Sequence, residues 1–173
     1  MSSPKTERVL RLAIVVLTVV FVFVLAGTLH ERIITVGDSA PDFSIKADNG
    51  QSVSTSSFGG KLLVLNFWAT WCPPCVEETP SLSRFAAQLA PSGVVVLGIS
   101  VDKDEKQYRD FVARYRPAFL TARDPQAKIN ADFGTFKYPE TYVISASGKV
   151  LRKFISDQPW DSDKMISDIK SLL

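Results

Sequence analysis

The sequence predicts an α/β fold in which a central mixed sheet is flanked by helices. Two near-continuous apolar runs, at residues 61–67 and 93–100, are each followed by a segment with helical spacing of apolar side chains. Two shorter strand-like runs and a final helical segment come after them. This order predicts two parallel strands with crossover helices, then an antiparallel hairpin and a closing helix, built on a four-stranded sheet.

The N-terminal segment predicts a membrane anchor. The eighteen residues from Leu12 to Leu29 carry no charge, and as a helix they would cover about 27 Å, close to the roughly 30 Å of bilayer hydrocarbon. A buried core helix is the alternative, but so uniformly apolar a helix would find no matching groove in a small soluble core. Lys5, Arg8 and Arg11 precede the run, which places the N-terminus in the cytoplasm and the rest of the chain outside.

A cleaved signal peptide is a second alternative, since residues 24–26 form a passable small-residue cleavage site. We favour an uncleaved anchor because the apolar run continues past that site. We therefore expect a single-pass protein of the cytoplasmic membrane with residues 1–11 in the cytoplasm and residues 12–29 in the bilayer. A tether at residues 30–37 would lead to a catalytic domain, residues 38–173, in the periplasm or another extracytoplasmic space.

The first half of this domain begins with a predicted β-hairpin around Asn49-Gly50, as an N-terminal extension of the core. The run at 61–67 is apolar almost throughout, as in a central strand covered on both faces. Pro73 and Pro74 suit the first turn of a helix that ends before Pro91. The apolar side chains that share one face of this helix are Leu82, Phe85, Ala86 and Leu89.

The second half continues the alternation of strands and helices. The run at 93–100 predicts a second buried strand, and residues 104–115 have helical spacing. Residues 117–138 predict looser structure with a short helix at about 126–133. The final elements are expected to be two strands, 141–145 and 149–155, joined by a turn, and a helix at about 160–173.

Composition supports one ordinary domain and argues against a nucleic-acid partner. The chain has 173 residues, of which 46% are hydrophobic and 22% charged, too apolar for a disordered protein. Residues 36–173 contain 16 Lys and Arg and 16 Asp and Glu, so this part carries no net charge. We therefore expect no binding to nucleic acid.

The two cysteines of the chain, Cys72 and Cys75, predict a redox centre. A Cys-x-x-Cys disulfide closes almost no loop and so contributes little chain-entropy stabilisation, which favours a chemical role over a structural one. Cys72 falls at the start of the predicted helix, where the macrodipole and free N–H groups favour the thiolate. We expect Cys72 to be the exposed, attacking thiol and Cys75, one turn into the helix, to be the resolving thiol.

A metal site and a strained structural disulfide are the alternatives for this pair. A zinc site would need further ligands, and the only histidine, His30, lies far away in the sequence. We therefore expect no metal and no cofactor beyond a redox-active Cys72–Cys75 disulfide.

Helical geometry separates two adjacent acids that follow the cysteines. Glu78 lies four residues before Leu82, on the inward face that also includes Cys75, whereas Glu77 is rotated by about 100° toward solvent. Burial should raise the pKa of Glu78, which would let it pass protons to and from Cys75. A partly solvated helix acid is the alternative for Glu78.

These motifs resemble the membrane-tethered TlpA/ResA/CcmG branch of the thioredoxin superfamily over about residues 36–173. The resemblance implies a thioredoxin-like fold with a cis proline at Pro139, before the third core strand and facing the cysteines. It also implies partner contacts near the cysteines, for which we expect Trp71, Pro73, Pro74, Tyr138 and Pro139. The segments that carry the resemblance are Phe67-Trp68-Ala69, Trp71-Cys72-Pro73-Pro74-Cys75, Glu78, Pro80 and Pro139-Glu140-Thr141.

The resemblance implies an extracytoplasmic thiol:disulfide oxidoreductase, typically a reductant. Its substrates would be oxidised partner proteins in cytochrome c maturation or copper-centre assembly, and a membrane donor of thiol-disulfide type would recharge it. Two departures from plain thioredoxins bear on this expectation. Asn66 replaces the buried acid of the preceding strand, which shifts proton relay to Glu78. The pair Pro73-Pro74 removes two N–H donors near Cys72, which favours a reducing couple.

Two other functions compete with this interpretation. A thiol peroxidase would share the fold, but its Pro-x-x-x-Thr/Ser-x-x-Cys string is absent, since Thr70 lies only two residues before Cys72. A copper-delivery protein using the two thiols would want a third ligand such as a nearby histidine, and the sequence offers none.

Overall fold

The computed structural model describes residues 4–28 and 33–173, with the backbone alone for residues 4–6 and 25–28. The chain divides into two compact units, Met1–Arg32 and Ile33–Leu173. Of the predicted tether at 30–37, residues 30–32 lie outside the described residues. Ile34, by contrast, is buried in the second unit and its N–H donates to the Phe133 carbonyl oxygen at 3.2 Å.

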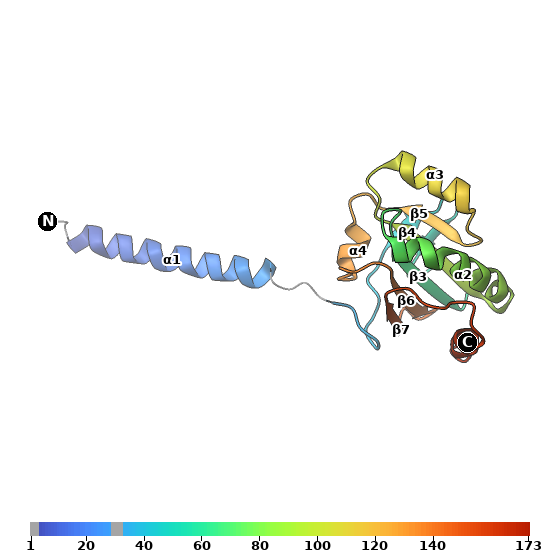
Figure 1. The fold of residues 1–173 in the computed structure, drawn as a ribbon. Coiled ribbons are helices and arrows are strands. Elements are labelled where there is room, and N and C mark those ends of the chain that lie inside the picture. Colours follow the sequence, from blue (N-terminus) through green and yellow to red (C-terminus); the bar gives the residue numbers. More distant parts are fainter. Residues whose placement is uncertain (1–3, 29–32) are drawn as a thin grey trace. The chain divides into compact units, whose positions relative to one another are not determined.

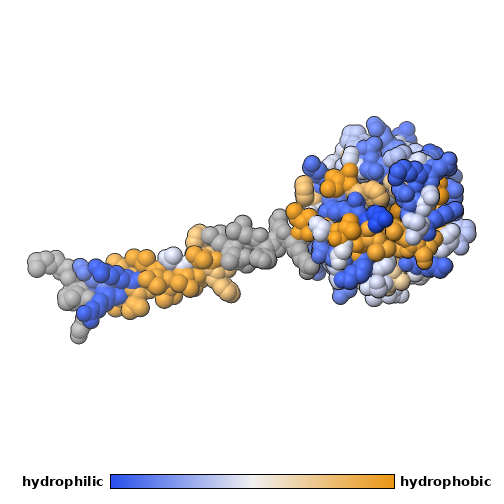
Figure 2. Space-filling model, turned by 90° about the horizontal axis from the view of Figure 1, so that it is seen from below, coloured by the Kyte–Doolittle hydropathy of each residue, from blue (hydrophilic) through white to orange (hydrophobic). Residues whose placement is uncertain are grey.

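The first unit contains one helix, α1 (Pro4–Thr28). Its side chains from Leu12 to Val24 are all exposed, and Figure 2 shows a mostly hydrophobic band along this unit, preceded by a hydrophilic stretch. Among the residues that the structure describes, no helix is long and apolar enough to cross a membrane. The predicted anchor at 12–29 extends past the described side chains and stays a prediction.

The second unit is a five-stranded mixed sheet with helices on both sides (Figure 1). The strand order is β5-β4-β3-β6-β7, in which β5, β4 and β3 are mutually parallel and β6 and β7 are antiparallel to their neighbours. The sheet strands are β3 (Leu62–Trp68), β4 (Val94–Ser100), β5 (Leu120–Arg123), β6 (Glu140–Ser145) and β7 (Val150–Ile155). The other elements are the hairpin β1 (Ser44–Lys46) and β2 (Ser52–Ser54), the helices α2 (Pro73–Leu89), α3 (Glu105–Tyr115), α4 (Lys128–Asp132) and α5 (Asp163–Lys170), and the 3₁₀ turn η1 (Ala90–Ser92).

The α/β class and most elements are confirmed, while the prediction of four strands is wrong. The missed strand is β5, which lies within the stretch expected to be looser. It is a four-residue edge strand in which only Thr121 and Ala122 are buried, so it lacks the long apolar run by which β3 and β4 were found. The final helix also begins later than predicted, because the Ser162 hydroxyl accepts the Met165 N–H and caps it.

Alternation along the strands builds a core on each face of the sheet. On one face, Leu62 and Val64 of β3 pack with α2 and α5. On the other face, Leu63 and Leu65 pack with the segment around Ile34, with the hairpin and with Phe133. Because β3 is the central strand and is buried at every position, its C-terminal end holds the start of the segment between β3 and α2 in a fixed position.

Candidate active site

The two cysteines lie where β3 passes into α2 and form a disulfide, with a Cα–Cα distance of 5.3 Å. Cys72 is the N-cap of α2 and has extended backbone angles. Its exposed fraction is 5%, against 1% for Cys75. Cys72 is thus the more accessible of the two, but the expectation that it is exposed is wrong for this oxidised form. The reason is that both sulfurs belong to an apolar cluster with Trp68 and Val101.

The first turn of α2 offers Cys72 few hydrogen-bond donors. Pro73 and Pro74 occupy the first two helical positions and have no N–H to give. The Cys75 N–H donates to the Cys72 sulfur at 3.3 Å. A thiolate at Cys72 would therefore meet the N-terminal end of the helix with two of its usual donors missing.

The predicted partner-binding residues surround this disulfide at the same edge of the sheet. Trp71 is 61% exposed, and its ring meets the half-buried Tyr138 edge to face at a centroid distance of 5.8 Å. The Tyr138–Pro139 peptide bond is cis, as the resemblance implied. Pro139 itself is buried. It precedes Glu140, which pairs with Phe67 near the end of β3.

The two proline side chains of the motif differ in access to solvent. Pro73 is exposed and Pro74 is half-buried. Exposed apolar groups beside a reactive disulfide suit contact with another protein. The geometry therefore allows the predicted contacts of Pro73 and Pro74 with a partner protein, which stay predictions.

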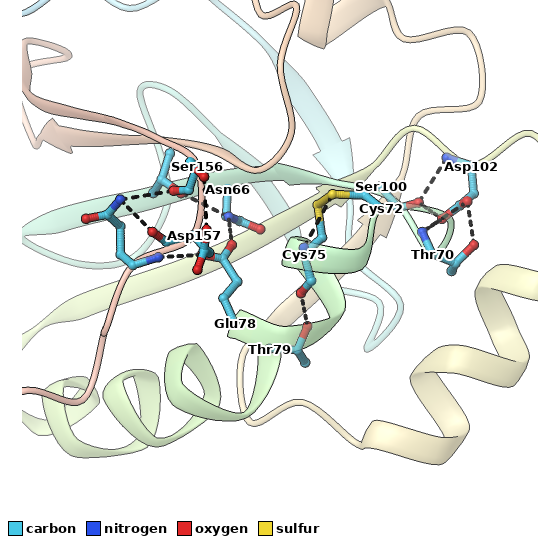
Figure 3. Close-up of a disulfide and its surroundings, with 12 residues drawn as sticks. Asn66, Thr70, Cys72, Cys75, Glu78, Thr79, Ser100, Asp102, Ser156 and Asp157 are labelled. Carbon is cyan, nitrogen blue, oxygen red and sulfur yellow. Dashed lines mark hydrogen bonds between the residues drawn. A yellow bond between two sulfur atoms is a disulfide. The ribbon is translucent and has the colours of Figure 1, made fainter.

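Glu78 faces inward, as predicted, and Glu77 is exposed. The Glu78 side chain accepts three N–H donors: Asn66 Nδ2 at 2.9 Å, Trp160 Nε1 at 2.9 Å and the Gln158 N–H at 3.3 Å. Figure 3 shows its carboxylate directed toward Asn66, and the disulfide lies one helical turn away. The acid therefore joins α2 to β3 and to the segment between β7 and α5.

Burial raises the pKa of Glu78 to about 7, because the charged carboxylate has lost most of its contact with water. The hydrogen bonds from Trp160, Asn66 and Gln158 act in the opposite direction and limit the rise. Asp157, a nearby acid, adds a smaller increase. A carboxyl group with this pKa can both accept and donate a proton near neutral pH.

Two groups of polar residues at this edge were not found from the sequence. The buried Asp102 after β4 binds Thr70, whose hydroxyl donates to Asp102 Oδ1 at 2.7 Å. The buried Glu140 forms an ion pair with Lys153 at 2.6 Å and accepts the Tyr142 hydroxyl at 2.8 Å. Thr70 follows β3 and Asp102 follows β4, and Lys153 on β7 reaches Glu140 on β6, so spacing along the chain gave no signal for these contacts between elements.

Within the described residues, no three His, Cys, Asp or Glu side chains gather where they could hold a metal ion. Thr70, which does not match the Thr/Ser position of the peroxidase string, donates its hydroxyl to Asp102 Oδ1 at 2.7 Å.

Comparison with known proteins assigns the architecture and its chemistry. The Redoxin family model matches residues 35–173. The chain belongs to the Redoxin family. One curated relative is the thioredoxin-like protein YneN of Bacillus subtilis, 39% identical over 116 residues, which cover 66% of this chain and 68% of YneN.

Two further matches indicate the kind of Redoxin protein that this chain resembles. The thiol-disulfide oxidoreductase ResA of Oceanobacillus iheyensis is 33% identical over 143 residues, covering 80% of this chain and 74% of ResA. The crystal structure of a putative thiol:disulfide interchange protein DsbE from Chlorobium tepidum matches with a TM-score of 0.73 and 28% identity, covering 80% of this chain and 98% of that one. The predicted resemblance to the TlpA/ResA/CcmG branch is confirmed. So is the enzyme class, a thioredoxin-like thiol:disulfide oxidoreductase.

Proposed function

We propose that this Redoxin domain works outside the cytoplasm as a reductant of protein disulfides. The observation that carries the proposal is the Cys72–Cys75 disulfide at the start of α2, where Cys72 is the less buried sulfur and Pro73 and Pro74 supply no N–H. A poorly stabilised thiolate makes the dithiol a better electron donor, because strong oxidants of this type owe their potential to a stabilised reduced form. The expected direction is therefore from this dithiol to the partner.

The proposed reaction has two exchange steps. The Cys72 thiolate attacks one sulfur of the partner disulfide, so that a mixed disulfide forms and the partner's other sulfur leaves as a thiolate that takes up a proton. The Cys75 thiol then loses its proton and attacks the Cys72 sulfur. The Cys72–Cys75 disulfide forms and the second partner thiol is released. The partner gains two electrons and two protons, and the dithiol is oxidised.

Glu78 is proposed to accept the proton of Cys75 in the second step and to return it when the disulfide is reduced again. Support comes from its position, buried on the same face of α2 as Cys75 and one turn further along the helix. Its pKa of about 7 also suits both directions of transfer. The Asn66 amide, which bonds Glu78, holds the carboxylate in this buried position.

The proposed partners are proteins with an oxidised cysteine pair, of the cytochrome c maturation or copper-centre assembly type. A membrane donor of thiol-disulfide type would reduce the Cys72–Cys75 disulfide after each cycle. Exposed apolar side chains along α1 and the basic residues before them support attachment to the cytoplasmic membrane through residues 12–29. The proposed partners and donor are based on the resemblance and on membership of the Redoxin family.

A trapping experiment tests this function directly. Cells that produce Cys75→Ser should accumulate mixed disulfides between Cys72 and partner proteins, which mass spectrometry can identify. The matched control is Cys72→Ser, which lacks the attacking thiol and should trap far less. Equal trapping by the two variants, or none by either, would contradict the proposed division of labour.

A further inference from the structure

The turn that presents Cys72 is held from behind by a buried carboxylate, Asp102, which follows β4 and is 1% exposed. The Asp102 carboxylate accepts the Thr70 hydroxyl at 2.7 Å, the Thr70 N–H at 2.9 Å and the Ser100 hydroxyl at 2.6 Å. Figure 3 shows this cluster on the side of the disulfide opposite to Glu78. Thr70 precedes Cys72 by two residues, so their Cα atoms are at most about 7 Å apart.

The negative charge of Asp102 is solvated by neutral donors. Arg123 approaches this region, but its Nη1 donates to the main-chain carbonyl oxygens of Asp102 and Lys103, at 3.4 and 3.2 Å. Its Nη2 pairs with Glu105 at 3.0 Å. Within residues 33–173, no Lys or Arg forms an ion pair with the Asp102 carboxylate. Hydrogen bonds from hydroxyl and amide groups stabilise such a charge without cancelling its field.

We propose that Asp102 is a positioning residue that fixes the Cys72 turn and, through its charge, restrains the reactivity of the Cys72 thiol. A nearby negative charge disfavours the thiolate, because like charges repel more strongly where little water screens them. This acts in the same direction as the missing N–H donors of Pro73 and Pro74. The inference rests on the proposed role of Cys72 as the attacking thiol.

Substitutions can separate the charge from the hydrogen bonds. Asp102→Asn removes the charge but keeps one oxygen as an acceptor. The hydroxyls of Thr70 and Ser100 lie on different carboxylate oxygens, so one can still donate to the amide oxygen and the other can accept from the amide nitrogen. Thr70→Val does the reverse, since it keeps the charge and removes one hydrogen bond. Asp110→Asn is the matched control, because Asp110 is an exposed acid on α3 that pairs with Lys106.

The measurement is the rate at which iodoacetamide alkylates Cys72 in the reduced full chain, followed by peptide mass spectrometry across a range of pH. Asp102→Asn should be alkylated about three- to tenfold faster than wild type near pH 7. The increase of its alkylation rate with pH should also begin at a lower pH than in wild type. Thr70→Val and Asp110→Asn should show no such acceleration. Asp102→Ser, a second variant without the charge, should repeat the acceleration and guards against poor folding of Asp102→Asn.

Three results would overturn the proposal. Wild-type rates in both Asp102 variants would show that the charge has no effect on Cys72. A similar acceleration in Thr70→Val would assign the effect to the position of the turn alone. Faster labelling of Cys75 than of Cys72 in the wild type would overturn the division of labour itself, and this proposal with it.

Discussion

At the scale of single residues, the fold removes two carboxylates near the disulfide from water, Glu78 and Asp102, and both are proposed to influence the reactivity of the cysteines. Glu78 has a pKa near the pH at which it would work, because burial and three N–H donors oppose each other there. The Asp102 carboxylate accepts hydrogen bonds from the Thr70 N–H and from the hydroxyls of Thr70 and Ser100. The two acids lie on opposite sides of one disulfide (Figure 3), so each can be tested separately.

Replacing Glu78 by Gln should change how disulfide exchange depends on pH. With Glu78 as the base, the resolving step should speed up as pH rises through about 7. In Glu78→Gln that rise should move toward the ordinary thiol pKa of about 8.5, with a rate at least about tenfold lower near pH 7. Stopped-flow exchange with a disulfide substrate measures this profile.

The control is Glu77→Gln, which changes the neighbouring exposed acid and should behave as wild type. A wild-type profile for Glu78→Gln would show that Glu78 has only a structural role.

Glu78 should also make folding stability depend on pH. The folded oxidised protein raises its pKa from 4.5 to about 7, so between these pH values the folded chain holds a proton that the unfolded chain has lost. The stabilisation from this proton is full below about pH 4.5 and is lost as pH rises through about 7. Denaturant unfolding should show the advantage of wild type over Glu78→Gln shrinking by up to about 3 kcal/mol from pH 4.5 to 8. A constant difference would contradict this.

Residue-scale prediction from the sequence succeeded where the partners are close along the chain. Helical periodicity alone separated inward Glu78 from exposed Glu77. The sequence could not predict that Trp160 would donate to Glu78, because 82 residues separate them and the loop between β7 and α5 brings them together. Asp102 was missed for the same reason, since only the pairing of β3 with β4 brings it to Thr70.

At the scale of elements, α3 supports the site by packing Tyr108 and Phe111 against Trp68, the last residue of β3. Strands with long apolar runs, such as β3 and β4, were predictable from the sequence. The short edge strand β5 was not, because its place in the sheet depends on pairing with β4 and not on its own composition.

The start of α3 is capped by an acidic side chain. Asp104 caps the helix by accepting the N–H groups of Lys106 and Gln107 at 2.8 and 3.1 Å. Asp104→Ala should therefore cost about 1 kcal/mol of unfolding free energy in urea titrations. Asp110→Ala, on the exposed face of the same helix, should cost much less. Equal losses in the two variants would show that the cap contributes nothing beyond charge.

At the scale of the whole molecule, the Redoxin domain at 33–173 and the apolar helix at 4–28 are separate units, and the proposed function needs both. The helix would keep the domain beside its membrane donor, while the domain carries the redox centre. The sequence predicted the domain's α/β fold class and its class of enzyme, a thiol:disulfide oxidoreductase. The place of work remains a proposal based on residues 12–29.

That proposal predicts a membrane-bound protein that begins near Met1. After cell fractionation, the full-length protein should stay with the membranes through an alkaline wash, because a segment that spans the bilayer, as proposed for residues 12–29, is not released by raising the pH. Immunoblotting and N-terminal mass spectrometry measure both properties. A soluble mature form that begins near Gly27 would show that the segment is a cleaved signal peptide.

Whether this dithiol gives electrons to its partners, as proposed, is decided by the reduction potential of the Cys72–Cys75 couple. Equilibration of the purified protein with glutathione redox buffers, followed by quantification of the reduced and oxidised forms, measures that potential. With Pro73 and Pro74 at the start of α2, we expect a value closer to thioredoxin, at about −270 mV, than to DsbA, at about −120 mV. A value near that of DsbA would mean that the domain oxidises its partners, and the proposed direction of electron transfer would be wrong.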